Sequence, residues 1–157
     1  MSSKRIMELR STMEERAQAM TSSDTTAPPA APGPAQLFQA SFDLLRRGSQ
    51  SAARSGFEEL LRRYPEFEHA SAALLYIGQS YADEKPPRTA EADSVYGLVV
   101  SRYPKSVDAP TALFKYALSQ IAQKKTAAGR TALQRIVREF PGSTEAELAA
   151  DRLRSLR

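Results

Sequence analysis

The sequence predicts an all-α fold, a solenoid of three helix pairs closed by a C-terminal helix. Three helical segments each end in an aromatic residue followed by proline, and their prolines, Pro65, Pro104 and Pro141, lie 39 and 37 residues apart. All 12 aromatic residues lie at or beyond Phe38, so the core has to be built from that part of the chain. A period of this length is the signature of stacked repeats.

The second helix of each pair is predicted from the segments FEELLRRYP, YGLVVSRYP and LQRIVREFP. Arginine near the end of each suits the negative end of the helix dipole, and proline cannot continue a helix. Counting back from each proline, a small residue stands 12 positions earlier, a bulky one 8 earlier and an aliphatic one 5 earlier. These positions hold Ala53, Ala92 and Gly129, then Phe57, Tyr96 and Leu133, then Leu60, Val99 and Ile136.

The first helix of each pair is predicted from LFQASFDLL, LLYIGQSYA and LFKYALSQI, with Ser41, Gly78 and Ala117 as small contact residues. First helices line the concave face of such a solenoid, so their inward residues are candidates for binding a partner helix or peptide. The candidates are Phe38, Phe42, Arg46, Leu75, Gln79, Asp83, Phe114 and Leu118. An alternative is that Phe38, Phe42 and Phe114 instead pack against the neighbouring repeat.

The segment after Pro141, GSTEAELAADRLRSLR, predicts a seventh helix. Thr144 and Glu147 have the spacing of a capping box, and arginines at 152, 154 and 157 are expected to face solvent. Terminal repeats need a polar outer face, so this helix is interpreted as a cap and not as a site.

Before the repeats, residues 1–20 predict a short helix or coiled-coil remnant, because Ile6, Met13 and Met20 lie seven apart. It could be a frayed charged helix or the stub of a longer coiled coil that forms a homo-oligomer. Residues 21–35, rich in Ala, Pro, Ser and Thr, predict a disordered linker, and residues 36–157 form the repeat domain. The chain begins without the apolar stretch of a signal peptide.

Composition argues against catalysis and cofactors. The chain has no Cys and one His, so thiolate metal sites, a cysteine nucleophile and a multi-histidine centre are excluded, and no catalytic residue, metal or cofactor is expected. The net charge of +4 is spread over helix ends among acidic residues, which does not favour nucleic acid. No apolar run is long enough for direct membrane insertion. A protein or peptide is therefore the expected partner.

The repeat pattern resembles the tetratricopeptide repeat, a helix–turn–helix unit, although Trp is absent and the loops are longer. The C-terminal part further resembles the periplasmic Tol-Pal accessory family YbgF, also called cell division coordinator CpoB. The resemblance lies in Ala40–Gly48, YIGQSY at Tyr76–Tyr81, SRYPKSVDAPTALFKYA at Ser101–Ala117, and REFPGSTEAELAADRL before the C-terminus.

That resemblance implies a periplasmic protein that binds TolA and coordinates outer-membrane constriction with septal peptidoglycan synthesis by a penicillin-binding synthase during cell division. Without it, a chain lacking a signal peptide would be placed in the cytoplasm. Two alternatives remain: outer-membrane assembly in the manner of BamD, whose lipidated Cys is absent here, and a general tetratricopeptide-repeat scaffold or oligomeriser.

Overall fold

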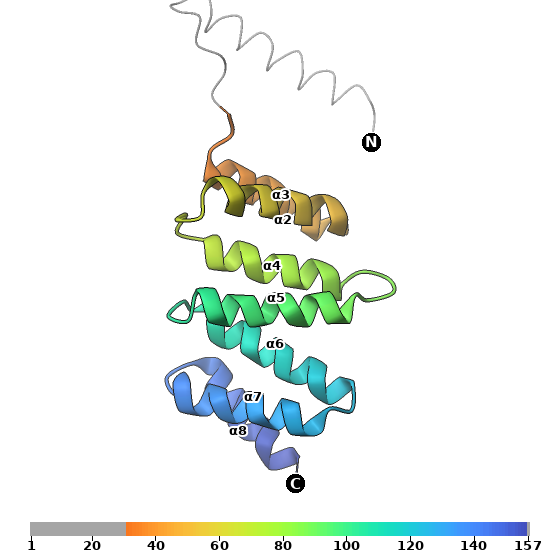
Figure 1. Cartoon of the computed structure of the whole chain (residues 1–157), viewed down its shortest axis with the longest axis vertical. Helices are drawn as coiled ribbons and strands as arrows, with labels where there is room; N and C mark the ends of the chain where they lie inside the picture. The colour runs from red at the N-terminus through yellow and green to blue at the C-terminus, as the bar shows by residue number, and fades with distance from the viewer. Residues whose placement is uncertain (1–30, 157) are drawn as a thin grey trace, which may run out of the picture. The chain divides into compact units, whose positions relative to one another are not determined.

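The computed structural model describes residues 31–156, which form seven α-helices and no strand. Successive helices run antiparallel and stack along one direction (Figure 1). The helices, labelled as in Figure 1, are α2 (Pro34–Arg46), α3 (Gln50–Arg63), α4 (Ala70–Ala82), α5 (Thr89–Arg102), α6 (Asp108–Ala122), α7 (Thr126–Glu139) and α8 (Thr144–Ser155). The predicted architecture of three helix pairs and a closing helix is therefore confirmed.

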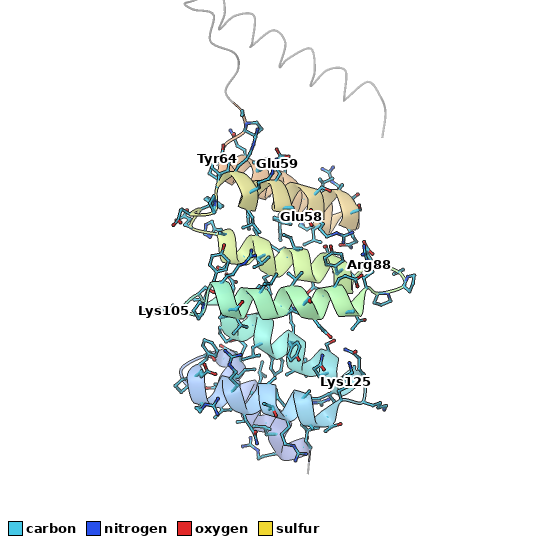
Figure 2. The ribbon with its side chains drawn as sticks, in the orientation of Figure 1. Glu58, Glu59, Tyr64, Arg88, Lys105 and Lys125 are labelled. Carbon is cyan, nitrogen blue, oxygen red and sulfur yellow. The ribbon has the colours of Figure 1, made fainter. Side chains whose placement is uncertain are left out.

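The helices divide into two layers. The first helices of the pairs, α2, α4 and α6, contact one another in succession, and α6 also contacts α8. In contrast, the second helices, α3, α5 and α7, do not contact one another. The closer spacing makes the layer of first helices the concave side, as expected from the sequence. Figure 2 shows the connections on alternate edges, with Tyr64 and Lys105 on one edge and Arg88 and Lys125 on the other.

The core follows the predicted register. Every small, bulky and aliphatic position that was counted from the prolines is buried, and so are Ser41, Gly78 and Ala117 in the first helices. Glycine at position 78 has a steric reason, because a Cβ there would lie 2.6 Å from Cε1 of Tyr96. The small residues thus allow the two helices of a pair to approach closely.

The three second helices end in the same way. The backbone N–H groups of Tyr64, Tyr103 and Phe140 donate to the carbonyls four residues earlier, and proline follows each of them. The start of α8 corrects a prediction, because its N-cap is Ser143 and not the Thr144–Glu147 pair. Ser143 Oγ accepts a hydrogen bond from the backbone N–H of Ala146 at 3.1 Å. Ser143 precedes the first helical residue, the place from which a side chain reaches a free N–H of the first turn.

The first helix begins at Pro34, two residues before the predicted domain boundary at residue 36. Proline fits the first turn of a helix because the N–H that it lacks would have no partner inside the helix. A compact unit begins at this residue. The predictions for residues 1–20 and for most of the linker lie outside the described residues. Within residues 31–156, no helix is long and apolar enough to cross a bilayer.

Candidate protein-binding groove

The concave face starts with an aromatic cluster between α2 and α4. The ring centroid of Phe38 lies 5.6 Å from that of Phe57 and 6.1 Å from that of Tyr76, and Phe42 lies 5.2 Å from Tyr76. Both predicted groove residues, Phe38 and Phe42, are half-buried by these contacts. They therefore pack against the neighbouring repeat, as the alternative interpretation expected. Arg46 is exposed beside them, with its guanidinium carbon 5.9 Å from the Phe42 ring.

The middle of the face is polar. Gln79 of α4 donates its Nε2–H to Oδ1 of Asp83, the C-cap residue that follows the helix, at 2.8 Å. The prediction that Leu75 is a groove residue is wrong, because Leu75 is only 7% exposed and belongs to the hydrophobic core. Its side chain is shorter than those of Phe38 and Phe114 at the same register, and it ends below the surface.

An open apolar groove lies at the C-terminal end of this face, between α6 and α8. Its volume is about 410 Å³. Leu118 is 37% exposed and Leu148 is 47% exposed, whereas Phe114 is half-buried beside them. The groove is lined by Phe114, Leu118, Leu148, Asp151, Arg152 and Ser155, and we call this set the α6–α8 groove.

Two charged residues of α8 lie in this lining and differ in their pairing. Asp151 forms an ion pair with Arg154 one turn later in the same helix. Arg152 is exposed and has no ion-pair partner among residues 31–156. Its guanidinium is therefore available to a carboxylate of a bound partner.

Only two of the predicted site residues, Phe114 and Leu118, lie in the α6–α8 groove. The other four lining residues lie on α8, which the sequence was interpreted to use only as a cap. Ala146 and Ala149 are buried and define the packed side of α8, so Leu148 stands at the margin of that side. An exposed leucine beside a buried alanine stripe is a signal that could have identified this wall of the groove.

The single histidine, His69, precedes α4 and is well exposed. Its ring lies 5.4 Å from the Phe67 ring and 5.8 Å from the Phe38 ring, and Nε2 is 3.5 Å from Glu68 Oε1. Aromatic packing and one surface carboxylate account for its surroundings. In the part of the chain that the structure describes, no group of three acidic, histidine or cysteine side chains is placed to hold a metal ion.

Comparison with known proteins identifies the repeats. The family model of the tetratricopeptide repeat matches residues 72–106 and 111–143, which hold most of α4 and α5 and of α6 and α7. No curated protein matches the chain.

Solved structures also match, among them the crystal structure of a tetratricopeptide repeat protein from Parabacteroides merdae. It is 16% identical, and the alignment has a TM-score of 0.41 and covers 79% of this chain. This chain spans 60% of the length of that protein. The family match and the stacked helix pairs lead to one conclusion: residues 72–106 and 111–143 form two tetratricopeptide repeats, a unit typical of protein–protein interaction scaffolds.

Proposed function

We propose that this protein is a non-enzymatic interaction module whose α6–α8 groove binds an apolar side chain of a partner protein or peptide. One observation carries the proposal: three apolar side chains, Phe114, Leu118 and Leu148, border an open groove on the concave face. Exposed apolar surface framed by polar residues is typical of interaction sites. Asp151, Arg152 and Ser155 provide that polar frame.

The energetic argument is one of burial. Covering an exposed leucine completely is worth roughly 1.5–3 kcal/mol, and Leu118 and Leu148 still expose more than a third of their surfaces. A partner residue seated between them would remove both surfaces from water. The interaction would then be stabilised mainly by the hydrophobic effect and oriented by the charged residues of α8.

In the cell, we propose that this module acts in the periplasm within the Tol-Pal system. Its partners would be TolA and a penicillin-binding peptidoglycan synthase, and its role would be to coordinate outer-membrane constriction with septal wall synthesis. The support is the sequence resemblance over Ser101–Ala117 and over the segment from Arg138 to Leu153. Both segments contribute to the α6–α8 groove, the first with Phe114 and the second with most of its α8 wall.

The test combines two substitutions that place charge in the groove, Leu118→Glu and Leu148→Glu. Binding of the purified periplasmic part of TolA and of the synthase is measured by calorimetry for wild type and variant. We expect a loss of affinity of at least about tenfold, the equivalent of roughly 1.4 kcal/mol. Circular dichroism should show an unchanged fold, because both leucines are substantially exposed.

The matched control is Leu98→Glu on α5, since Leu98 is 38% exposed but belongs to the layer of second helices. It should bind like wild type. If the double variant binds as tightly as wild type, the α6–α8 groove is not the site. If wild type itself binds neither partner, the Tol-Pal role is wrong, and the groove proposal then has to be tested with other peptides.

A further inference from the structure

A second apolar hollow lies among α5, α6 and α7, in the layer of second helices. It consists of two adjoining pockets of about 280 Å³ and 270 Å³ that share Leu113 and Tyr116 of α6 and Arg135 of α7. The remaining lining comes from Tyr96, Gly97, Val100 and Ser101 of α5 and from Ala128, Thr131 and Ala132 of α7. Leu113 and Tyr116 form the floor of the hollow, because α6 belongs to the layer of first helices that lies behind α5 and α7.

Comparison between repeats shows that small residues open this hollow. Counted from the prolines, Gly97 and Ser101 of α5 correspond to Glu58 and Arg62 of α3. On the opposite wall, Ala128 and Ala132 of α7 correspond to Glu91 and Val95 of α5. The equivalent place between α3 and α5 is therefore bordered by four larger side chains. A Cβ added at Gly97 would meet no atom within 4 Å, so the space beside it is empty.

Arginine brings positive charge to the hollow. Arg135 is the one charged residue among its lining, and it borders both pockets. Helix α7 carries three arginines and a single glutamate, and α5 ends in the exposed Arg102. Glu139 is shared, because its Oε2 lies 2.5 Å from Arg135 Nε and 3.7 Å from Arg138 Nη2. Two guanidinium groups thus share one carboxylate, which leaves an excess of positive charge at this end of α7.

We infer that this hollow is a second docking site, for an acidic peptide segment that carries one bulky apolar side chain. The apolar side chain would lie over Tyr116, between Gly97 and Ala132, and a neighbouring carboxylate would pair with Arg135. Space is sufficient, because a closed apolar cavity of roughly 150 Å³ accommodates a benzene ring in another protein. The complementary charge selects an acidic partner over a basic one. The site is independent of the α6–α8 groove.

The test uses a phage-displayed random peptide library. It is selected on a protein that carries Leu118→Glu and Leu148→Glu, so that peptides of the α6–α8 groove are not recovered. Enriched peptides are synthesised with a fluorescent label, and their affinities are measured by anisotropy. A further variant, Gly97→Glu with Ser101→Arg, fills the hollow with the residues that the first repeat has at the equivalent positions, Glu58 and Arg62. The matched control, Ser51→Glu with Ser55→Arg, introduces the same residues with the same spacing at exposed positions of α3.

We expect enriched peptides to combine Leu, Phe or Trp with a nearby Asp or Glu. The filled variant should bind them at least about tenfold more weakly, and the control should bind them like wild type. Arg135→Gln, which leaves the hollow open, should lower the affinity for these peptides about threefold to tenfold and reduce the salt dependence of binding. The inference is overturned if no peptide is enriched, if the enriched peptides lack acidic residues, or if the filled variant binds them like the control.

Discussion

One substitution, glycine to alanine, should have opposite effects at two helical positions, Gly78 in α4 and Gly97 in α5. A Cβ at position 78 would lie 2.6 Å from Cε1 and 2.8 Å from Cδ1 of Tyr96, distances that van der Waals contact does not allow. Tyr96 is only 4% exposed, so its ring is held by the core and cannot simply turn away. At position 97, the added Cβ would meet no atom within 4 Å.

The magnitudes follow from two opposing terms. Alanine is favoured over glycine in a helix interior by about 0.8–1 kcal/mol, and this gain applies at both positions. At Gly97 nothing opposes it, so Gly97→Ala should raise the free energy of unfolding by about 0.5–1 kcal/mol. At Gly78 the helices must separate, and overpacking costs typically 1–3 kcal/mol. Contacts below 3 Å favour the upper part of that range, so Gly78→Ala should lose about 1–2 kcal/mol.

Urea denaturation followed by far-ultraviolet circular dichroism measures both variants against wild type. The two midpoints should shift in opposite directions, and the slopes should stay equal, because the surface exposed on unfolding does not change. Gly78→Ser is a further check, since a larger side chain at the same place should be at least as destabilising. If Gly78→Ala proves as stable as wild type, Tyr96 does not pack over Gly78, and the close approach of α4 and α5 is wrong.

Three further predictions concern buried polar groups and one turn. Arg54→Met should lower the free energy of unfolding by about 1–3 kcal/mol in the same urea assay, because it removes the 2.7 Å ion pair between Arg54 and Glu84. The Glu84 carboxylate retains one partner, because Arg88 lies 3.8 Å from it. Burial, with a smaller contribution from nearby aspartates, raises the pKa of Tyr96 to about 12, so spectrophotometric titration should find one tyrosine that ionises late. Folding favours the protonated form of Tyr96, so the free energy of unfolding should decrease between about pH 10 and pH 12. Tyr96→Phe should remove the contribution of Tyr96 to this decrease. Lys124→Gly should raise the melting temperature, because Lys124 has φ +66° where the equivalent Gly48 has φ +82°, and a side chain in that conformation costs roughly 1–2 kcal/mol.

The core could be predicted well from the sequence because the same pattern recurs in each repeat. A small residue 12 positions before proline can be a coincidence once, but Ala53, Ala92 and Gly129 occur in one register with the bulky and aliphatic positions. Stacking requires the same contact at each step, so the shared register had to be the packed one. Residues outside that register were harder to place, because exposure depends on side-chain length and on the neighbouring helix. Leu75, buried where Phe114 reaches the surface, is the clearest case.

The candidate groove was only half predictable because it joins two helices that were assigned different roles. Phe114 and Leu118 were expected from the inward register of the first helices. Leu148 and Arg152 were not, since a terminal helix needs only to be polar outside, and α8 satisfies that need. The contact between α6 and α8 repeats the contact between α4 and α6, so extending the register past Pro141 would have placed Asp151 and Ser155, the equivalents of Phe114 and Leu118, on this face.

The two roles of α8 are physically compatible because they use different sides of one helix. Thirteen residues after each proline, the interior first helices have a small residue, Gly78 or Ala117, against which a second helix packs. Helix α8 has Arg154 there, 66% exposed at its side chain, so a further helix could not approach in the same register without burying that charge. The buried alanines hold α8 against α7, and Leu148 remains at the surface beside Leu118. Helix α8 therefore keeps an apolar edge exposed on the concave face, where a partner can cover it.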